Sequence, residues 1–158
     1  MSELNELYQQ LILEHNKSPR NFKKLEVFTH DADGYNPLCG DHYHIWLKLD
    51  GETISDIGFH GSGCAISKSS ASMMTAAIKG KKIAEAKDLF EKFHSVIMTK
   101  IGDEIPEEKI EELGSLGALA GVREFPARIK CASLSWHAFN AALNQSAPTV
   151  STEQEKNY

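Results

Sequence analysis

The spacing of apolar residues predicts helices early in the chain and through its middle. A first helix is expected over residues 3–16, where leucine and isoleucine recur every three or four positions. A second helix, over residues 64–79, is rich in small residues and stops at Gly80. An amphipathic third helix follows over residues 82–100. These segments alone supply several apolar helix faces that need a partner.

The later part of the chain also reads as helical. Pro106 begins a polar stretch with helical spacing, because proline is favoured in the first turn of a helix. Residues 114–121 contain three glycines and are predicted to be loosely helical and mobile. Pro126 separates this segment from a last helix over about residues 131–145.

Strict alternation of apolar and polar residues predicts a β-hairpin between the first two helices. One strand covers residues 42–49, residues 50–52 turn the chain, and residues 54–59 form the return strand. Residues 21–37, rich in turn formers, are expected to be irregular. Strands gathered early and helices late predict an α+β fold, with a small antiparallel sheet packed against several helices. The sheet would consist of the hairpin plus a possible third strand.

The length and composition fit one soluble domain. A chain of 158 residues with 41% hydrophobic and 25% charged residues can bury one core, expected over residues 1–147. Residues 148–158 are polar and predicted to be a disordered tail. The net charge of -5 argues against binding to nucleic acid or an anionic membrane, and no apolar run could span a bilayer. The acidic start lacks a signal peptide, so a cytoplasmic location is expected.

Three cysteines, an odd number, argue against a disulfide framework and leave metal binding or incidental burial as alternatives. If residues 39–41 are extended, Cys39 and Asp41 face one point, where a thiolate and a carboxylate need a cation. Cys64 and Cys131 are each expected at a helix N-terminus, which favours the thiolate. Three thiolates and one carboxylate make a plausible four-coordinate site for zinc or an iron–sulfur cluster.

Cations and histidines near the cysteines are further candidate members of this site. Arg123, Arg128 and Lys130 are candidates to offset its negative charge. Along a strand, His42 and His44 should point to the face opposite Asp41, and a histidine at 60 remains a competing ligand. Histidine 137 lies more than half a turn around the last helix from Cys131.

The motifs Asn-Pro-Leu-Cys-Gly-Asp at 36–41, Gly-Ser-Gly-Cys-Ala-Ile-Ser at 61–67 and Lys-Cys-Ala at 130–132 together resemble the IscU/NifU-N iron–sulfur cluster assembly family. The resemblance extends to about residue 145. Lysine instead of histidine before the last cysteine, and a longer stretch between the second and third cysteines, are similar to the SufU-type subfamily. An IscU-like fold is therefore implied.

The resemblance also implies a function. SufU-type proteins bind zinc at the positions of Cys39, Asp41, Cys64 and Cys131, and accept persulfide sulfur from a SufS-like cysteine desulfurase. On this basis Cys39 would carry the sulfur, Arg128 would stabilise sulfur anions, and a Suf-type cluster scaffold would receive the sulfur. The chain would then act as a zinc-dependent sulfurtransferase. The alternatives are an IscU-like scaffold that assembles a [2Fe–2S] cluster on the same ligands, and a purely structural zinc site.

Overall fold

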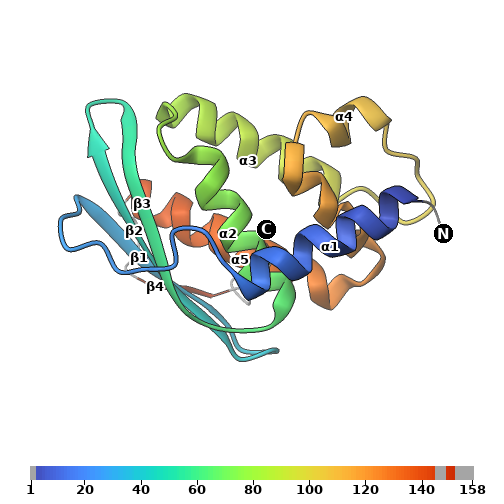
Figure 1. Cartoon of the computed structure of the whole chain (residues 1–158), viewed down its shortest axis with the longest axis horizontal. Coiled ribbons are helices and arrows are strands. Elements are labelled where there is room, and N and C mark those ends of the chain that lie inside the picture. The colour runs from blue at the N-terminus through green and yellow to red at the C-terminus, as the bar shows by residue number, and fades with distance from the viewer. Residues whose placement is uncertain (1–2, 145–148, 152–158) are drawn as a thin grey trace.

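The computed structural model describes residues 3–144 and 149–151 (Figure 1). Within these residues the helices are α1 (Glu3–Lys17), α2 (Ala65–Ile78), α3 (Ile83–Ile97), α4 (Glu107–Glu111), the 3-10 helix η1 (Gly114–Glu124) and α5 (Pro126–Asn144). The strands are β1 (His30–Asn36), β2 (Asp41–Asp50), β3 (Thr53–Ser62) and β4 (Thr149–Ser151). The strands gather at one end of the molecule, and α4 lies toward the other.

The sheet has the strand order β3-β2-β1-β4. β2 pairs antiparallel with both β1 and β3, and β4 pairs parallel with β1. Within β2, Tyr43 and Ile45 are fully buried. His42, just before them, and Lys48, further along the strand, are exposed. This alternation gives the sheet one apolar face, which packs against α2 and α5. The α+β fold with an antiparallel hairpin is therefore confirmed.

One hydrophobic core joins the sheet to the helices. Its largest fully buried side chains come from all the layers; they include Tyr43, Phe59, Met73, Phe93 and Trp136. In the helical layer, Trp136 of α5 stacks on Phe93 of α3 with ring centroids 5.6 Å apart. Helix α5 thus packs between the sheet and the other helices, and this packing fixes the position of the residues at its start.

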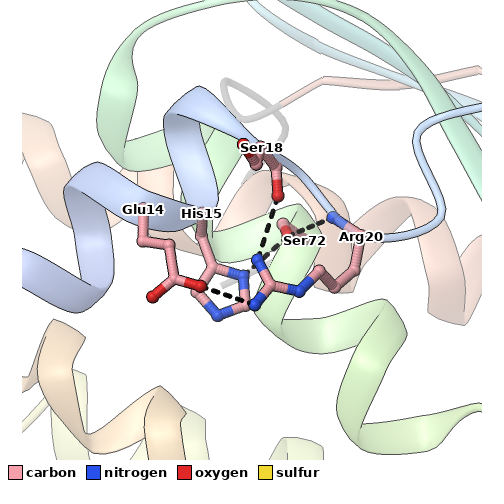
Figure 2. Close-up of polar contacts among 5 residues, drawn as sticks. All are labelled: Glu14, His15, Ser18, Arg20 and Ser72. Atoms are coloured by element: carbon pink, nitrogen blue, oxygen red, sulfur yellow. Dashed lines mark hydrogen bonds and ion pairs between the residues drawn. The ribbon is translucent and has the colours of Figure 1, made fainter.

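The C-terminal end of α1 is tied to the middle of α2, as Figure 2 shows. Ser72 Oγ lies 2.7 Å from Nδ1 of the buried His15 and accepts the Arg20 backbone N–H at 2.8 Å. Burial lowers the pKa of His15, so the neutral ring can accept the Ser72 hydroxyl proton. Outside this contact, the Arg20 guanidinium pairs with Glu14 at 2.7 Å and donates to the Ser18 carbonyl. These bonds fix α1 against the helix that starts at Cys64.

Three expectations about the secondary structure were wrong. Residues 30–36 form strand β1 rather than irregular chain, because the hydrogen-bonding edge of β2 pairs with them along their whole length. Helix α5 begins at Pro126, five residues before the predicted start. The polar tail predicted from residue 148 includes β4 at 149–151, and the remainder lies outside the described residues.

The glycine-containing segment at 114–121 packs against the core. It belongs to η1, whose Leu116 and Leu119 are fully buried in the core. Loose helical structure is therefore confirmed as a 3-10 helix, and mobility stays a prediction. Pro106 caps α4, as expected for a proline at a helix start.

Candidate metal centre

Three of the four predicted ligands meet at one point. Ligand atoms of Cys39, Asp41 and Cys131 all lie within 4.8 Å of one another. The Cys131 thiol points at Cys39, with the two Sγ atoms 3.5 Å apart. Cys64 adjoins this group through a hydrogen bond with the Cys131 thiol. The fold therefore brings together side chains that are 92 residues apart in sequence.

Cys39 is placed by a tight turn rather than by an extended segment. The backbone N–H groups of Cys39 and Gly40 both donate to the Asn36 carbonyl, at 3.3 and 2.8 Å. Gly40 has a φ of +72°, in the left-handed region that favours glycine. The expected extended geometry was wrong. The turn nevertheless delivers Cys39 beside Asp41, and leaves Cys39 the exposed thiol of the three.

Asp41 is fully buried at the first position of β2 and is held through both carboxylate oxygens. The Cys64 backbone N–H donates to Oδ1 at 2.8 Å, and the Asn36 side-chain amide donates to Oδ2 at 3.2 Å. Asn36 is itself fully buried. Asn36 belongs to the first cysteine motif, but its burial could not be inferred from the sequence because the strand β1 was not predicted.

Cys64 is the N-cap residue of α2, which confirms its predicted position at a helix start. The Ser67 backbone N–H donates to Cys64 Sγ at 3.5 Å. The hydrogen bond from the Cys131 thiol, with the Ser67 backbone bond in support, lowers the pKa of Cys64 to about 5. These contacts favour the thiolate form of Cys64.

Gly63, just before this cap, leaves room for the site. A Cβ on Gly63 would lie 2.5 Å from Asp41 Oδ1, 2.6 Å from Ser67 Oγ and 2.9 Å from the Tyr43 hydroxyl. Three oxygen atoms therefore surround a position that only a hydrogen atom can occupy. Burial raises the pKa of Tyr43 to about 12, which keeps its hydroxyl protonated.

Cys131 lies in the second turn of α5 and is fully buried, so its predicted place at the helix N-terminus was wrong. The helix dipole consequently gives it little help. Its contact with the Cys64 thiolate and its burial raise the pKa of Cys131 above the ordinary value of a thiol. The Cys131 side chain therefore contacts both of the other cysteines.

Among the candidate cations, Arg128 interacts with the thiols. It stands three residues before Cys131 on α5, and hence on the same side of the helix. The charge of the Cys64 thiolate, together with a hydrogen bond to Cys131, raises the pKa of Arg128. Arg123 instead donates to the carbonyl oxygens of Lys100 and Asp103. Lys130, half-buried on α5, directly precedes Cys131.

The histidines lie outside this group. His44 contacts Asp31 and Asp33 with its two ring nitrogens, at 2.7 and 2.6 Å, and His42 is exposed beside Asp33. Both therefore face away from Asp41, as predicted. The competing ligand His60 stacks on Phe22 with centroids 4.6 Å apart and joins none of the described metal-binding groups.

The donor atoms fit a zinc ion. Zinc accepts cysteine sulfur and aspartate oxygen in tetrahedral sites, and at Zn–S distances of about 2.3 Å its ligand atoms lie roughly 3–4 Å apart. The Cys39 and Cys131 sulfur atoms are 3.5 Å apart, and all three ligand atoms lie within 4.8 Å of one another. Two thiols and a buried carboxylate without a paired cation would also repel one another once ionised. The group can therefore hold a metal ion, with Cys64 available as a fourth donor.

A groove of about 940 Å³ opens beside the site. Cys64 and Arg128 line it, together with apolar side chains such as Ile12 of α1 and Val122 of η1. The Cys64 thiol therefore borders this groove. Among the described residues, no helix combines the length and the apolar character that crossing a bilayer requires.

Known proteins resemble this chain over most of its length. The zinc-dependent sulfurtransferase SufU of Bacillus subtilis is 45% identical over 140 residues, covering 89% of this chain and 91% of that protein. The iron–sulfur cluster assembly scaffold protein IscU of Streptococcus pyogenes is 41% identical over 147 residues, covering 93% of this chain and 89% of the relative.

The fold is shared with solved structures of the same group. A crystal structure from Fervidobacterium islandicum, described as a candidate iron–sulfur cluster assembly scaffold protein for the SUF system, superposes with a TM-score of 0.76. It is 30% identical and covers 88% of this chain and 98% of its own. The family model of the NifU-like N-terminal domain matches residues 7–132, which include all four predicted ligands. The chain therefore belongs to the NifU-like N-terminal domain family.

Proposed function

We propose that this chain is a zinc-dependent sulfur carrier in cytoplasmic iron–sulfur cluster assembly. It would accept persulfide sulfur from a SufS-like cysteine desulfurase and pass it to a Suf-type cluster scaffold. The observation that carries the proposal is the unequal exposure of the three thiols. Cys39 is exposed, whereas Cys64 is half-buried and Cys131 is buried. A thiol that meets a partner protein must be reachable, and the turn after Asn36 presents Cys39 in that way.

The transfer step needs one nucleophile and one leaving group. The Cys39 thiolate attacks the outer sulfur of the desulfurase persulfide, a new S–S bond forms on Cys39, and the old S–S bond breaks. The desulfurase cysteine leaves as a thiolate, and the proton of the outer sulfur travels with that sulfur. The step is an exchange between sulfur atoms and requires no oxidant.

The other site residues support this exchange. Asp41, Cys64 and Cys131 would hold zinc together with Cys39, and bound zinc keeps thiols deprotonated and protected from oxidation. Arg128, exposed beside the thiols, places a permanent positive charge next to the sulfur anions that form and leave. The similarity to the zinc-dependent sulfurtransferase of Bacillus subtilis supports the assignment of zinc and of sulfur transfer.

A second function has its own support. The Streptococcus pyogenes relative is a cluster assembly scaffold, and three thiols are a suitable ligand set for an iron–sulfur cluster. On this alternative a [2Fe–2S] cluster is the cargo, built on Cys39, Asp41, Cys64 and Cys131.

One experiment separates the two functions. The protein is purified without added metal, its zinc and iron contents are measured, and cysteine desulfurase turnover is assayed with and without it. We expect bound zinc, strong stimulation of turnover, and a persulfide on Cys39 detectable by mass spectrometry. The Cys39→Ser variant should fold and yet accept no sulfur. Absence of stimulation together with transfer of an intact cluster to an apo-acceptor would favour the scaffold function.

A further inference from the structure

Asn36 contacts three of the four candidate ligands at once. Its side-chain Nδ2 donates to Asp41 Oδ2 at 3.2 Å and lies 3.6 Å from Cys131 Sγ. Its backbone carbonyl accepts the N–H of Cys39. Asn36 is fully buried between β1 and β2, so the amide has a fixed direction. The residue therefore links the exposed thiol, the carboxylate and the buried thiol.

The amide nitrogen of Asn36 lies within hydrogen-bonding distance of two candidate ligand atoms, Asp41 Oδ2 and Cys131 Sγ. A donor on the back of a ligating carboxylate or thiolate orients that ligand and offsets part of its charge. Asn36 Oδ1 meanwhile accepts the Leu38 backbone N–H at 3.2 Å, which helps to form the turn that carries Cys39. Donor and acceptor ends of one amide thus serve two separate purposes.

We propose that Asn36 is the positioning residue of the metal centre, and that its Nδ2 donor sets the affinity and the geometry of metal binding. The inference rests on the metal site of the proposed function and is independent of sulfur transfer. The amide would hold Asp41 and Cys131 ready for a tetrahedral ion before the ion arrives. Removal of an outer partner of this kind typically costs about 10- to 100-fold in metal affinity.

Two substitutions separate the role of the Asn36 side-chain donor from its role in forming the turn. Asn36→Asp keeps the shape and the acceptor for the Leu38 N–H, and removes the N–H donor. Asn36→Ala removes both. The matched control is Ser72→Ala, which deletes a buried hydrogen-bonding group of α2 that contacts His15 and Arg20 instead of the thiols.

The readout is metal binding by the purified full chain, without any desulfurase. Zinc affinity is measured by competition with a chromophoric chelator, and cobalt(II) replaces zinc to report ligand geometry through its absorption spectrum. We expect both Asn36 variants to lose about 10- to 100-fold in zinc affinity and to show altered cobalt bands, with Ser72→Ala unchanged. Thermal unfolding of the metal-free proteins reports folding separately.

Two results would overturn the inference. Wild-type affinity in Asn36→Ala would show that the amide does not position the ligands. Loss in Asn36→Ala together with wild-type affinity in Asn36→Asp would assign the effect to the turn instead of the donor. The experiment measures metal binding and not sulfur acceptance. Its result can therefore be interpreted even if the sulfur-carrier proposal fails.

Discussion

The backbone N–H of Cys64 donates to Asp41 Oδ1 at 2.8 Å, and so joins the start of α2 to the start of β2. One carboxylate therefore caps a backbone group of the helix and also belongs to the candidate metal group. Structural and chemical roles of Asp41 overlap, and suitable substitutions separate them.

Asp41→Asn and Asp41→Ala should differ in stability and agree in metal binding. Asparagine keeps an oxygen for the Cys64 N–H, whereas alanine leaves that donor without its acceptor. We expect Asp41→Ala to lower the free energy of unfolding of the metal-free protein by about 1–3 kcal/mol, with a smaller effect of Asp41→Asn. Both should bind zinc more weakly. Urea denaturation and chelator competition measure the two effects; equal stability of both variants would contradict the capping role.

Gly63→Ala should disturb the site although the new side chain is one methyl group. Its Cβ would overlap Asp41 Oδ1 and Ser67 Oγ, so the carboxylate or the first turn of α2 has to move. We expect a loss of about 1–3 kcal/mol in unfolding free energy and weaker zinc binding. Gly121→Ala, at a position with open space around its Cβ and without a positive φ, controls for loss of a glycine as such. Unchanged zinc affinity in Gly63→Ala would show that the site tolerates the shift.

Ser72→Ala should weaken the fold and spare the metal centre. The substitution removes the hydroxyl that contacts His15 and accepts the Arg20 N–H (Figure 2). Leaving these buried groups without a partner should cost about 1–3 kcal/mol in unfolding free energy. Thermal or urea unfolding measures the loss. A variant as stable as the parent would mean that α1 is held to α2 by apolar packing alone.

Acid should destabilise the protein through its buried histidines. Burial lowers the pKa of His15, His94 and His137, the last from 6.5 to about 4. The unfolded chain then binds more protons than the folded one in this range, so unfolding free energy rises with pH. The contribution of these histidines to the free energy of unfolding is fully present above about pH 6.5 and is lost as the pH falls toward 4. His137 accounts for about 3 kcal/mol of it.

The His137→Phe variant isolates this effect from the titration of carboxylates. Phenylalanine suits the surrounding aromatic rings of Phe90 and Trp136 and has no proton to bind. Urea denaturation of the metal-free protein at a series of pH values should show a shallower dependence in the variant between pH 4 and 6.5. An identical dependence in both proteins would contradict the assignment to His137.

Prediction from sequence succeeded where one pattern dominated. The alternation around Tyr43 and the small-residue helix after Cys64 both appear in the structure. Strand β1 was missed because Asp31, Asp33 and Gly34 have low strand propensity, and pairing with β2 overrides that preference. The start of α5 was missed because Pro126 was interpreted as a separator, whereas it is the first residue of the helix.

The candidate ligands could be named from sequence, whereas their pKa shifts could not be predicted. Motifs bring Cys39, Asp41, Cys64 and Cys131 to attention, but the early start of α5 moves Cys131 away from the helix end and into the core. Opposite pKa shifts of Cys64 and Cys131 follow from contacts across the fold. The buried Asn36 amide contacts Cys131, which is 95 residues away in sequence.

The long separation between Cys39 and Cys131 has a consequence for biosynthesis. Ribosomes deliver the chain from its N-terminus, so the turn, the hairpin and the first turn of α2 are made well before α5. A nascent chain that ends before α5 holds Cys39, Asp41 and Cys64 without the thiol that lies between them. If these residues bind the metal as proposed, the complete site forms only after α5 has docked, and the metal content would then report completed folding.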